Sequence, residues 1–299
     1  MTSTNFKTLM RMFIVAALAI VSIPSFAQQP SAQSNTQSQT QRPRRVNLDS
    51  ARVFIRPSKS PGLGKEMKKL KEDKDGFISM FNGKNLKGWD ALPRFWSVKD
   101  GVIECVEGPG PGDNIQSNLV WMDSQKNPEK YANVEIHVQY RWLSNGGNSG
   151  VQVRGVMNVD STKHIAGYQA DMDPQNNYTG GIYDESALSG RRTKDVQGPH
   201  ISPRGFKVTY PADGGEGKAT PLAETSEQLA SYLKPVGQEF NELVIIAQGS
   251  HITVKINGHV FTEMIDENPG ALKNGIVALQ QHAGAGMQIQ FKDPKIKFL

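Results

Sequence analysis

The stretch LVIIAQGSHITVKINGHVF, residues 243–261, decides the fold class. It contains two runs rich in β-branched residues, 243–247 and 252–256, which are separated by Gly249-Ser250 and followed by Asn257-Gly258. Asn-Gly accepts the positive φ angles that a type I′ hairpin turn requires. Short apolar runs joined by such turns are typical of antiparallel strands. The stretch therefore predicts a three-stranded meander.

The same pattern of short apolar runs separated by turn residues extends through residues 76–299, where Asp100-Gly101 forms a second candidate hairpin turn. We expect one all-β sandwich of two antiparallel sheets, although strand and turn signals alone do not separate a jelly roll from other sandwiches. One long interruption, residues 186–238, includes a helix-like segment that Thr225 and Gln228 could cap, and excursions of this length are often rim loops. Further strands are expected at residues 133–142, 150–154, 168–172, 181–183, 276–281 and 287–291.

The N-terminal residues have the pattern of a cleaved export signal. Lys7 and Arg11 precede an apolar run at residues 12–23, and Ser25-Phe26-Ala27 supplies the small residues that a signal peptidase reads. The apolar run is shorter than the roughly 20 residues that span a bilayer. We predict a signal peptide at residues 1–27, cleaved near Ala27, and a periplasmic or secreted bacterial protein without a transmembrane span. The alternative is an uncleaved N-terminal anchor.

The basic charge of the chain lies outside the expected domain. Residues 28–75 hold 11 Lys or Arg against 5 Asp or Glu, whereas residues 76–299 hold 21 against 24. The polar composition of residues 28–75 predicts a disordered linker, with weak attraction to an anionic envelope surface as the alternative. The negative domain argues against a nucleic-acid partner. Cys105, the one cysteine, excludes an intramolecular disulfide and is expected to be a small buried hydrophobe.

Several segments of residues 76–299 resemble the bacterial 3-keto-disaccharide hydrolase family. They are FISMFNGKNLKGW at 77–89, WSVKDG at 96–101, GNSGVQVR at 147–154, Asn257-Gly258 and LQQH at 279–282, in the expected order. The resemblance implies a concanavalin A-like jelly roll that acts on an oxidised oligosaccharide or glycoside with a ketone at carbon 3. Family members often carry the acid and the amide in the opposite order at Gln169 and Asp171.

A ketone at carbon 3 acidifies the proton on carbon 2, so a base can remove that proton and the enolate can expel the glycosidic oxygen. Such a site needs a base, a donor for the enolate oxygen and an acid for the leaving group. The catalytic candidates are His282 as base or acid, Arg154 as cationic donor and Asp171 as partner carboxylate. Residues 169, 171 and 173 would share one strand face. The expected substrate-binding residues are Gln169, Asp173, Glu185, Gln280 and Gln152.

No cofactor is indicated. The remaining histidines, His137, His164, His200, His251 and His259, do not have the spacing of a zinc site, although a divalent metal held by residues that converge in space stays open. A non-catalytic carbohydrate-binding or scaffolding β-sandwich is the alternative function, because fold does not fix function. An enzyme predicts that His282, Arg154 and an aspartate converge in one pocket, whereas a binding module predicts scattered polar residues and an exposed aromatic platform. The sequence does not indicate the oligomeric state.

Overall fold

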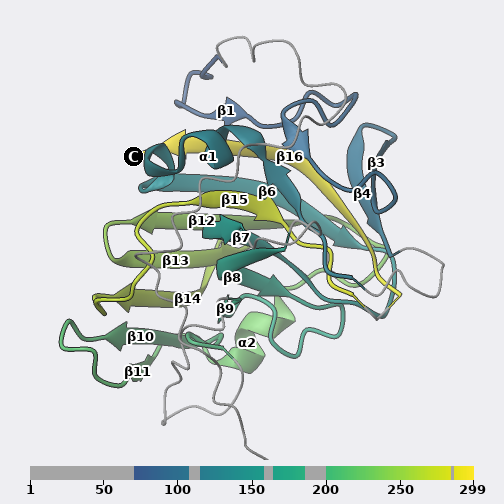
Figure 1. Ribbon diagram of the computed structural model, residues 1–299. Coiled ribbons are helices and arrows are strands. Elements are labelled where there is room, and N and C mark those ends of the chain that lie inside the picture. Colours follow the sequence, from purple (N-terminus) through teal and green to yellow (C-terminus); the bar gives the residue numbers. More distant parts are fainter. Residues whose placement is uncertain (1–70, 108–114, 158–163, 186–199, 284–285) are drawn as a thin grey trace, which may run out of the picture. The chain divides into compact units, whose positions relative to one another are not determined.

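The computed structural model describes residues 71–107, 115–157, 164–185, 200–283 and 286–299 (Figure 1). The predicted signal peptide and most of the predicted linker lie outside these residues. The described residues form two β-sheets with short helical segments, which confirms the expected all-β jelly-roll sandwich. No described helix is long and apolar enough to cross a membrane.

The large sheet has ten strands in the order β11-β10-β14-β13-β12-β6-β16-β4-β3, with β1 paired to β16. The predicted meander is β12–β14, and one pairing, β10 with β14, is parallel rather than antiparallel. The strands are β1 (Ile78–Ser79), β3 (Trp96–Lys99), β4 (Val102–Val106), β6 (Val134–Trp142), β10 (Phe206–Tyr210), β11 (Lys218–Pro221), β12 (Asn241–Gln248), β13 (His251–Ile256), β14 (His259–Asp266) and β16 (Gln288–Phe298).

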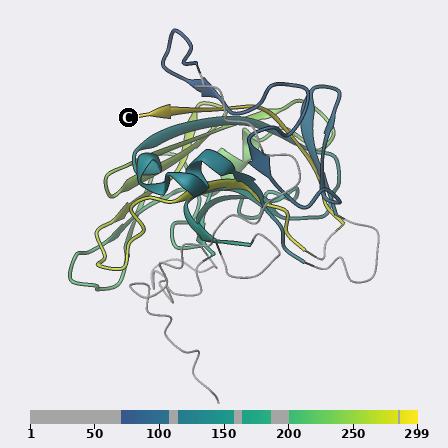
Figure 2. The same ribbon diagram turned by 45° about the horizontal axis from the view of Figure 1, so that its top comes forward.

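The small sheet has six strands in the order β2-β5-β15-β7-β8-β9. Figure 2 shows β16 of the large sheet and β15 of the small sheet as separate yellow strands, with helix α1 beside β15. The strands are β2 (Trp89–Asp90), β5 (Leu119–Trp121), β7 (Ser149–Met157), β8 (Ile165–Met172), β9 (Ile182–Asp184) and β15 (Ile276–Leu279), and the helices are α1 (Met122–Lys126), the 3-10 helix η1 (Pro128–Tyr131) and α2 (Ser226–Ser231).

The local signals in the sequence form the expected structures. Asp100 and Gly101 have φ values of 50° and 77°, and Asn257 and Gly258 have 51° and 87°, so both turns have the positive φ pair of type I′. Helix α2 begins with the predicted capping box, in which Thr225 and Gln228 exchange side-chain and backbone hydrogen bonds.

The core lies between the sheets, and the large sheet has one face turned to it. Along β6 the residues alternate between buried and partly exposed, with Val134, Ile136 and Val138 on the buried face. Cys105 is fully buried as predicted, and desolvation raises the pKa of its thiol.

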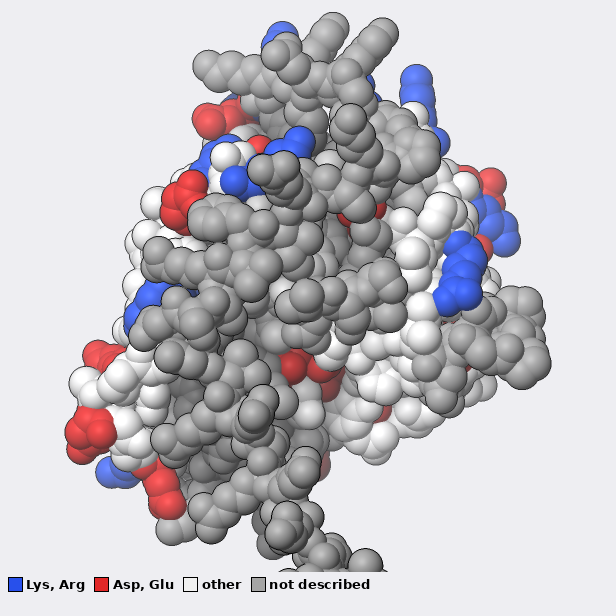
Figure 3. All heavy atoms as spheres, viewed as in Figure 1, with Lys and Arg blue, Asp and Glu red and all other residues white. Residues whose placement is uncertain are grey.

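The small sheet is covered on both faces at its centre. All residues of β7 from Ser149 to Gly155 are buried, although only Val151 and Val153 belong to the main core. Gln152, between them, is a buried polar residue whose side chain turns to the other face. The surface has a different character. On the face of the molecule drawn in Figure 3, acidic and basic side chains of the described residues are interspersed and do not form patches of one charge.

Candidate functional site

The candidate site lies on the face of the small sheet that turns away from the main core. In β8, Tyr168, Ala170 and Met172 pack into the core, so the alternation of the strand places Gln169 and Asp171 on the opposite face. Gln169 is 1% exposed and Asp171 is 5% exposed. Buried polar groups need partners, and these two residues define where the partners gather.

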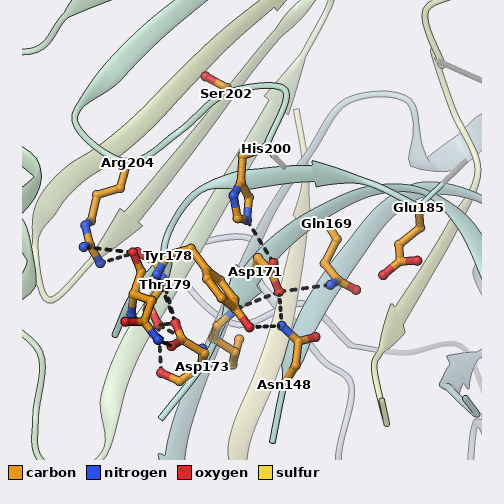
Figure 4. A network of polar contacts seen from close by, with 12 residues as sticks. Asn148, Gln169, Asp171, Asp173, Tyr178, Thr179, Glu185, His200, Ser202 and Arg204 are labelled. Atoms are coloured by element: carbon orange, nitrogen blue, oxygen red, sulfur yellow. Dashed lines mark hydrogen bonds and ion pairs between the residues drawn. The ribbon is translucent and has the colours of Figure 1, made fainter. Parts of the chain in front are cut away.

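Asp171 lies at the centre of this polar cluster (Figure 4). Its Oδ1 accepts hydrogen bonds from Asn148 Nδ2 at 2.9 Å, Gln169 Nε2 at 3.2 Å and the Met172 backbone N–H at 3.1 Å. Its Oδ2 lies 2.9 Å from His200 Nε2. The carboxylate of Asp171 is thus the acceptor that these donors share.

The hydrogen bond to Asp171 determines the tautomer of His200. Because ionised Asp171 only accepts, His200 Nε2 carries the hydrogen, and Nδ1 of neutral His200 keeps the lone pair. The imidazole lies between Tyr178 and Tyr183, with ring centroids at 5.3 and 5.8 Å. Gly181 makes room for it, since a Cβ there would lie 2.9 Å from the His200 Cδ2 atom. His200 is thus a buried, oriented base.

Tyr178 provides a donor beside this base. Its hydroxyl oxygen accepts a hydrogen bond from Asn148 Nδ2 at 3.2 Å, which leaves its own O–H free to donate elsewhere. Burial raises the pKa of Tyr178 and the charges of Asp171 and Asp173 add to this effect, while the hydrogen bond from Asn148 opposes it. The hydroxyl therefore stays protonated at neutral pH.

An amide bridge extends the cluster to a second carboxylate. Gln169 Nε2 also donates to Gln280 Oε1 at 3.0 Å, and Gln280 Nε2 donates to Glu185 Oε1 at 2.7 Å. Gly150 admits the Gln169 side chain, because a Cβ there would lie 2.4 Å from Gln169 Cγ. Among the described residues, Gln169 Oε1 is buried without a hydrogen-bond partner. It is an acceptor that a ligand hydroxyl could satisfy.

Asp173 has a different role from the predicted contact with substrate. Its carboxylate accepts hydrogen bonds from the backbone N–H groups of Asn177, Tyr178 and Thr179, and from the side chains of Asn177 and Thr179. Five donors saturate a carboxylate, which has about four lone-pair positions. Asp173 therefore shapes the turn that carries Tyr178.

Arg154 does not lie with Asp171. Its guanidinium donates to three backbone carbonyls, those of Leu272 at 3.1 Å, Ala132 at 2.9 Å and Gly249 at 2.7 Å. Burial lowers its pKa. Its own φ is 54°, at a β-bulge in β7. These contacts give Arg154 a structural role. They do not support its predicted role as cationic donor.

His282 and Gln152 are also not joined to the cluster by hydrogen bonds between described residues. His282 is partly exposed, and its Nδ1 donates to the carbonyl of Ala283 at 2.8 Å. Gln152 is opposite Gln169 in the strand register, but it accepts from Asn118 and donates to the carbonyl of Ile165. The structure thus joins four predicted site residues, which are Gln169, Asp171, Glu185 and Gln280.

Sequence reasoning missed His200, Asn148 and Tyr178 as site residues. In the sequence, His200 is only one of several histidines without the spacing of a zinc site, and Asn148 only a member of the segment GNSGVQVR. No periodicity relates these positions to Asp171, because they lie on different loops that the sheet order brings together. No group of three or more His, Cys, Asp or Glu residues in the described part of the chain could hold a metal ion.

Comparison with known proteins identifies relatives of this chain. A family model described as the 3-keto-alpha-glucoside-1,2-lyase-like domain matches residues 76–297. A protein of Bacteroides thetaiotaomicron named 3-keto-disaccharide hydrolase is 33% identical over 90 residues. This match covers 27% of the present chain and 28% of that relative.

Solved structures with a similar arrangement share little sequence with the chain. A protein of Parabacteroides distasonis assigned as a glycosyl hydrolase has a TM-score of 0.46 and 19% identity, over 75% of this chain and 94% of its own. The carbohydrate-binding module CBM66 of Bacillus subtilis has a TM-score of 0.34 and 9% identity, over 78% of this chain and 99% of its own.

Proposed function

The chain belongs to the 3-keto-alpha-glucoside-1,2-lyase-like family, and from this premise we propose that it cleaves glycosides whose sugar ring carries a ketone at carbon 3. The single observation that carries the proposal is the buried pair of Asp171 and His200, with the hydroxyl of Tyr178 beside it. The predicted export makes a periplasmic or secreted location part of the same proposal.

His200 Nδ1 is the group that removes the proton from carbon 2. Asp171 orients the imidazole and stabilises the imidazolium that forms, as carboxylates do in other histidine bases. Tyr178 donates its free O–H to the oxygen on carbon 3, where negative charge develops in the enolate. These roles replace those expected for His282 and Arg154.

Collapse of the enolate expels the glycosidic oxygen and leaves a double bond between carbons 1 and 2. Water then adds across this bond, so that the net reaction is hydrolysis. Direct displacement by a nucleophilic carboxylate is disfavoured, because the oxygens of Asp171 already bind four donors. Convergence of polar groups in one place also favours an enzyme over a carbohydrate-binding module.

The test is release of free sugar from 3-keto-α-glucosides and from the matching unoxidised glucosides by the purified full chain. We expect cleavage of the ketone substrates only. His200→Gln retains a donor for Asp171 but removes the base, so kcat/KM should fall by roughly 10²–10⁴-fold.

His137→Gln is the matched control, because His137 also pairs with a carboxylate, Glu135, but on the outer face of the large sheet. It should leave cleavage unchanged. No cleavage of any ketone substrate by the folded protein, with or without divalent metal ions, would refute the proposal and favour the binding module.

A further inference from the structure

The cluster continues beyond Gln280 to a second pair of a histidine and a carboxylate. Glu185 Oε2 lies 3.5 Å from His164 Nε2, and the two side chains are 13% and 26% exposed. This pair is more open to solvent than Asp171 and His200, whose side chains are 6% and 4% exposed. The site thus has a buried end at Asp171 and His200 and a more exposed end at Glu185 and His164.

The two ends cannot perform the same task. Two amide side chains, Gln169 and Gln280, lie between the carboxylates of Asp171 and Glu185, so Glu185 does not orient His200. In Figure 4, Glu185 and Tyr178 lie on opposite sides of Gln169. A substrate that spans the cluster would present different atoms to each end.

The orientation of the Gln169 amide shows which hydrogen-bonding group is available between the two pairs. Both Nε2 hydrogens of Gln169 are used, one for Asp171 and one for Gln280. The remaining acceptor, Gln169 Oε1, is buried and has no hydrogen-bond partner among the residues that the structure describes. A buried acceptor without a partner is destabilising, and a hydroxyl of the substrate would remove this penalty. Three groups therefore follow one another along the site: the Tyr178 hydroxyl, the Gln169 carbonyl and the Glu185 carboxyl.

A 3-keto-glycoside presents three successive oxygens, on carbons 3, 2 and 1. Resting on the proposed function, we propose that Glu185 is the catalytic acid that protonates the departing oxygen on carbon 1. Tyr178 then faces the oxygen on carbon 3, and Gln169 Oε1 accepts the hydroxyl on carbon 2.

The proton transfers balance in this arrangement. His200 takes the proton from carbon 2, the bond from carbon 1 to the glycosidic oxygen breaks, and the O–H proton of Glu185 passes to that oxygen. When water adds, its hydroxyl binds carbon 1, its proton returns to the Glu185 carboxylate, and His200 returns a proton to carbon 2. Both groups end as they began.

The acid is tested by changing the leaving group. A 4-nitrophenoxide leaves as an anion, whereas a methoxide needs a proton. Glu185→Gln retains an oxygen acceptor for Gln280 and removes the acidic proton. We expect kcat/KM for methyl 3-keto-α-glucoside to fall by about 10²-fold or more and that for the 4-nitrophenyl glycoside to change less than about fivefold.

Glu135→Gln is the matched control and should change neither substrate, because Glu135 pairs with His137 on the large sheet. Equal losses on both substrates in Glu185→Gln, or no loss on either, would overturn the inference and leave the proposed function intact. If the wild-type protein cleaves neither ketone substrate, the proposed function fails and this inference fails with it.

Discussion

One pair of a histidine and a carboxylate from each sheet can be compared, because the two pairs have opposite surroundings. On the large sheet His137 lies 2.7 Å from Glu135, and their side chains are 20% and 24% exposed. On the small sheet His200 lies 2.9 Å from Asp171, and theirs are 4% and 6% exposed. Water weakens the first pair, whereas a low dielectric strengthens the interactions of the second. The comparison teaches that burial, rather than the pairing itself, distinguishes the candidate site.

The largest effect is expected when the pair of His200 and Asp171 loses its carboxylate. Asp171→Asn retains the size of the side chain but presents an N–H to His200, so the imidazole must place its hydrogen on Nδ1 and loses its basic lone pair. We expect kcat/KM on 3-keto-glycosides to fall about 10³–10⁴-fold. The matching change on the large sheet, Glu135→Gln, should have no such effect. Equal activity of the two variants would remove the distinction between the sheets.

The second prediction concerns Arg154, which connects β7 to carbonyls beside the large-sheet strands β6 and β12 and to the carbonyl of Leu272. Arg154→Met leaves three carbonyls without their donor, and we expect a loss of about 3–5 kcal/mol of unfolding free energy in urea titrations. Arg141→Met on the outer face of the large sheet, which removes hydrogen bonds to Gln290 Oε1 and to the Gln238 carbonyl, should cost about 1–2 kcal/mol. A variant of Arg154 that stays stable but loses cleavage would restore its predicted catalytic role.

The smallest of the three effects is expected for Tyr178, the proposed donor to the enolate oxygen. Tyr178→Phe removes the donor to the enolate oxygen, and we expect kcat/KM to fall about 10²-fold. Burial raises the pKa of the wild-type phenol, so the donor is present below that raised pKa and is lost as the pH rises through it. In the wild-type protein, kcat/KM should therefore decrease above a pH of about 10, and this decrease should be absent in Tyr178→Phe. A decrease that persists unchanged in Tyr178→Phe would exclude this donor.

Most of the fold could be predicted from the sequence because its signals are local. The Asn257-Gly258 turn and the Thr225 cap depend on neighbouring residues only, and both form as expected. The parallel pairing of β10 with β14 had no such signal. It depends on where a long excursion returns to the sheet, which local preferences do not determine.

The site was predictable only where strand alternation determines it. Gln169 and Asp171 share a face because side chains alternate along β8, and Gln280 joins them from β15. Asp173 fits the same alternation but lies beyond the end of β8, where the chain turns and the turn itself saturates the carboxylate. His200 comes from a distant segment, so no spacing in the sequence could relate it to Asp171.

Strand β16 pairs with β1, β4 and β6, so the last strand in chain order lies inside the large sheet. A ribosome delivers the chain from its N-terminus, and these three strands must therefore wait for their partner until almost the whole domain has been synthesised. Such long-range pairings make folding slow. During that interval the unpaired strand edges are exposed to aggregation.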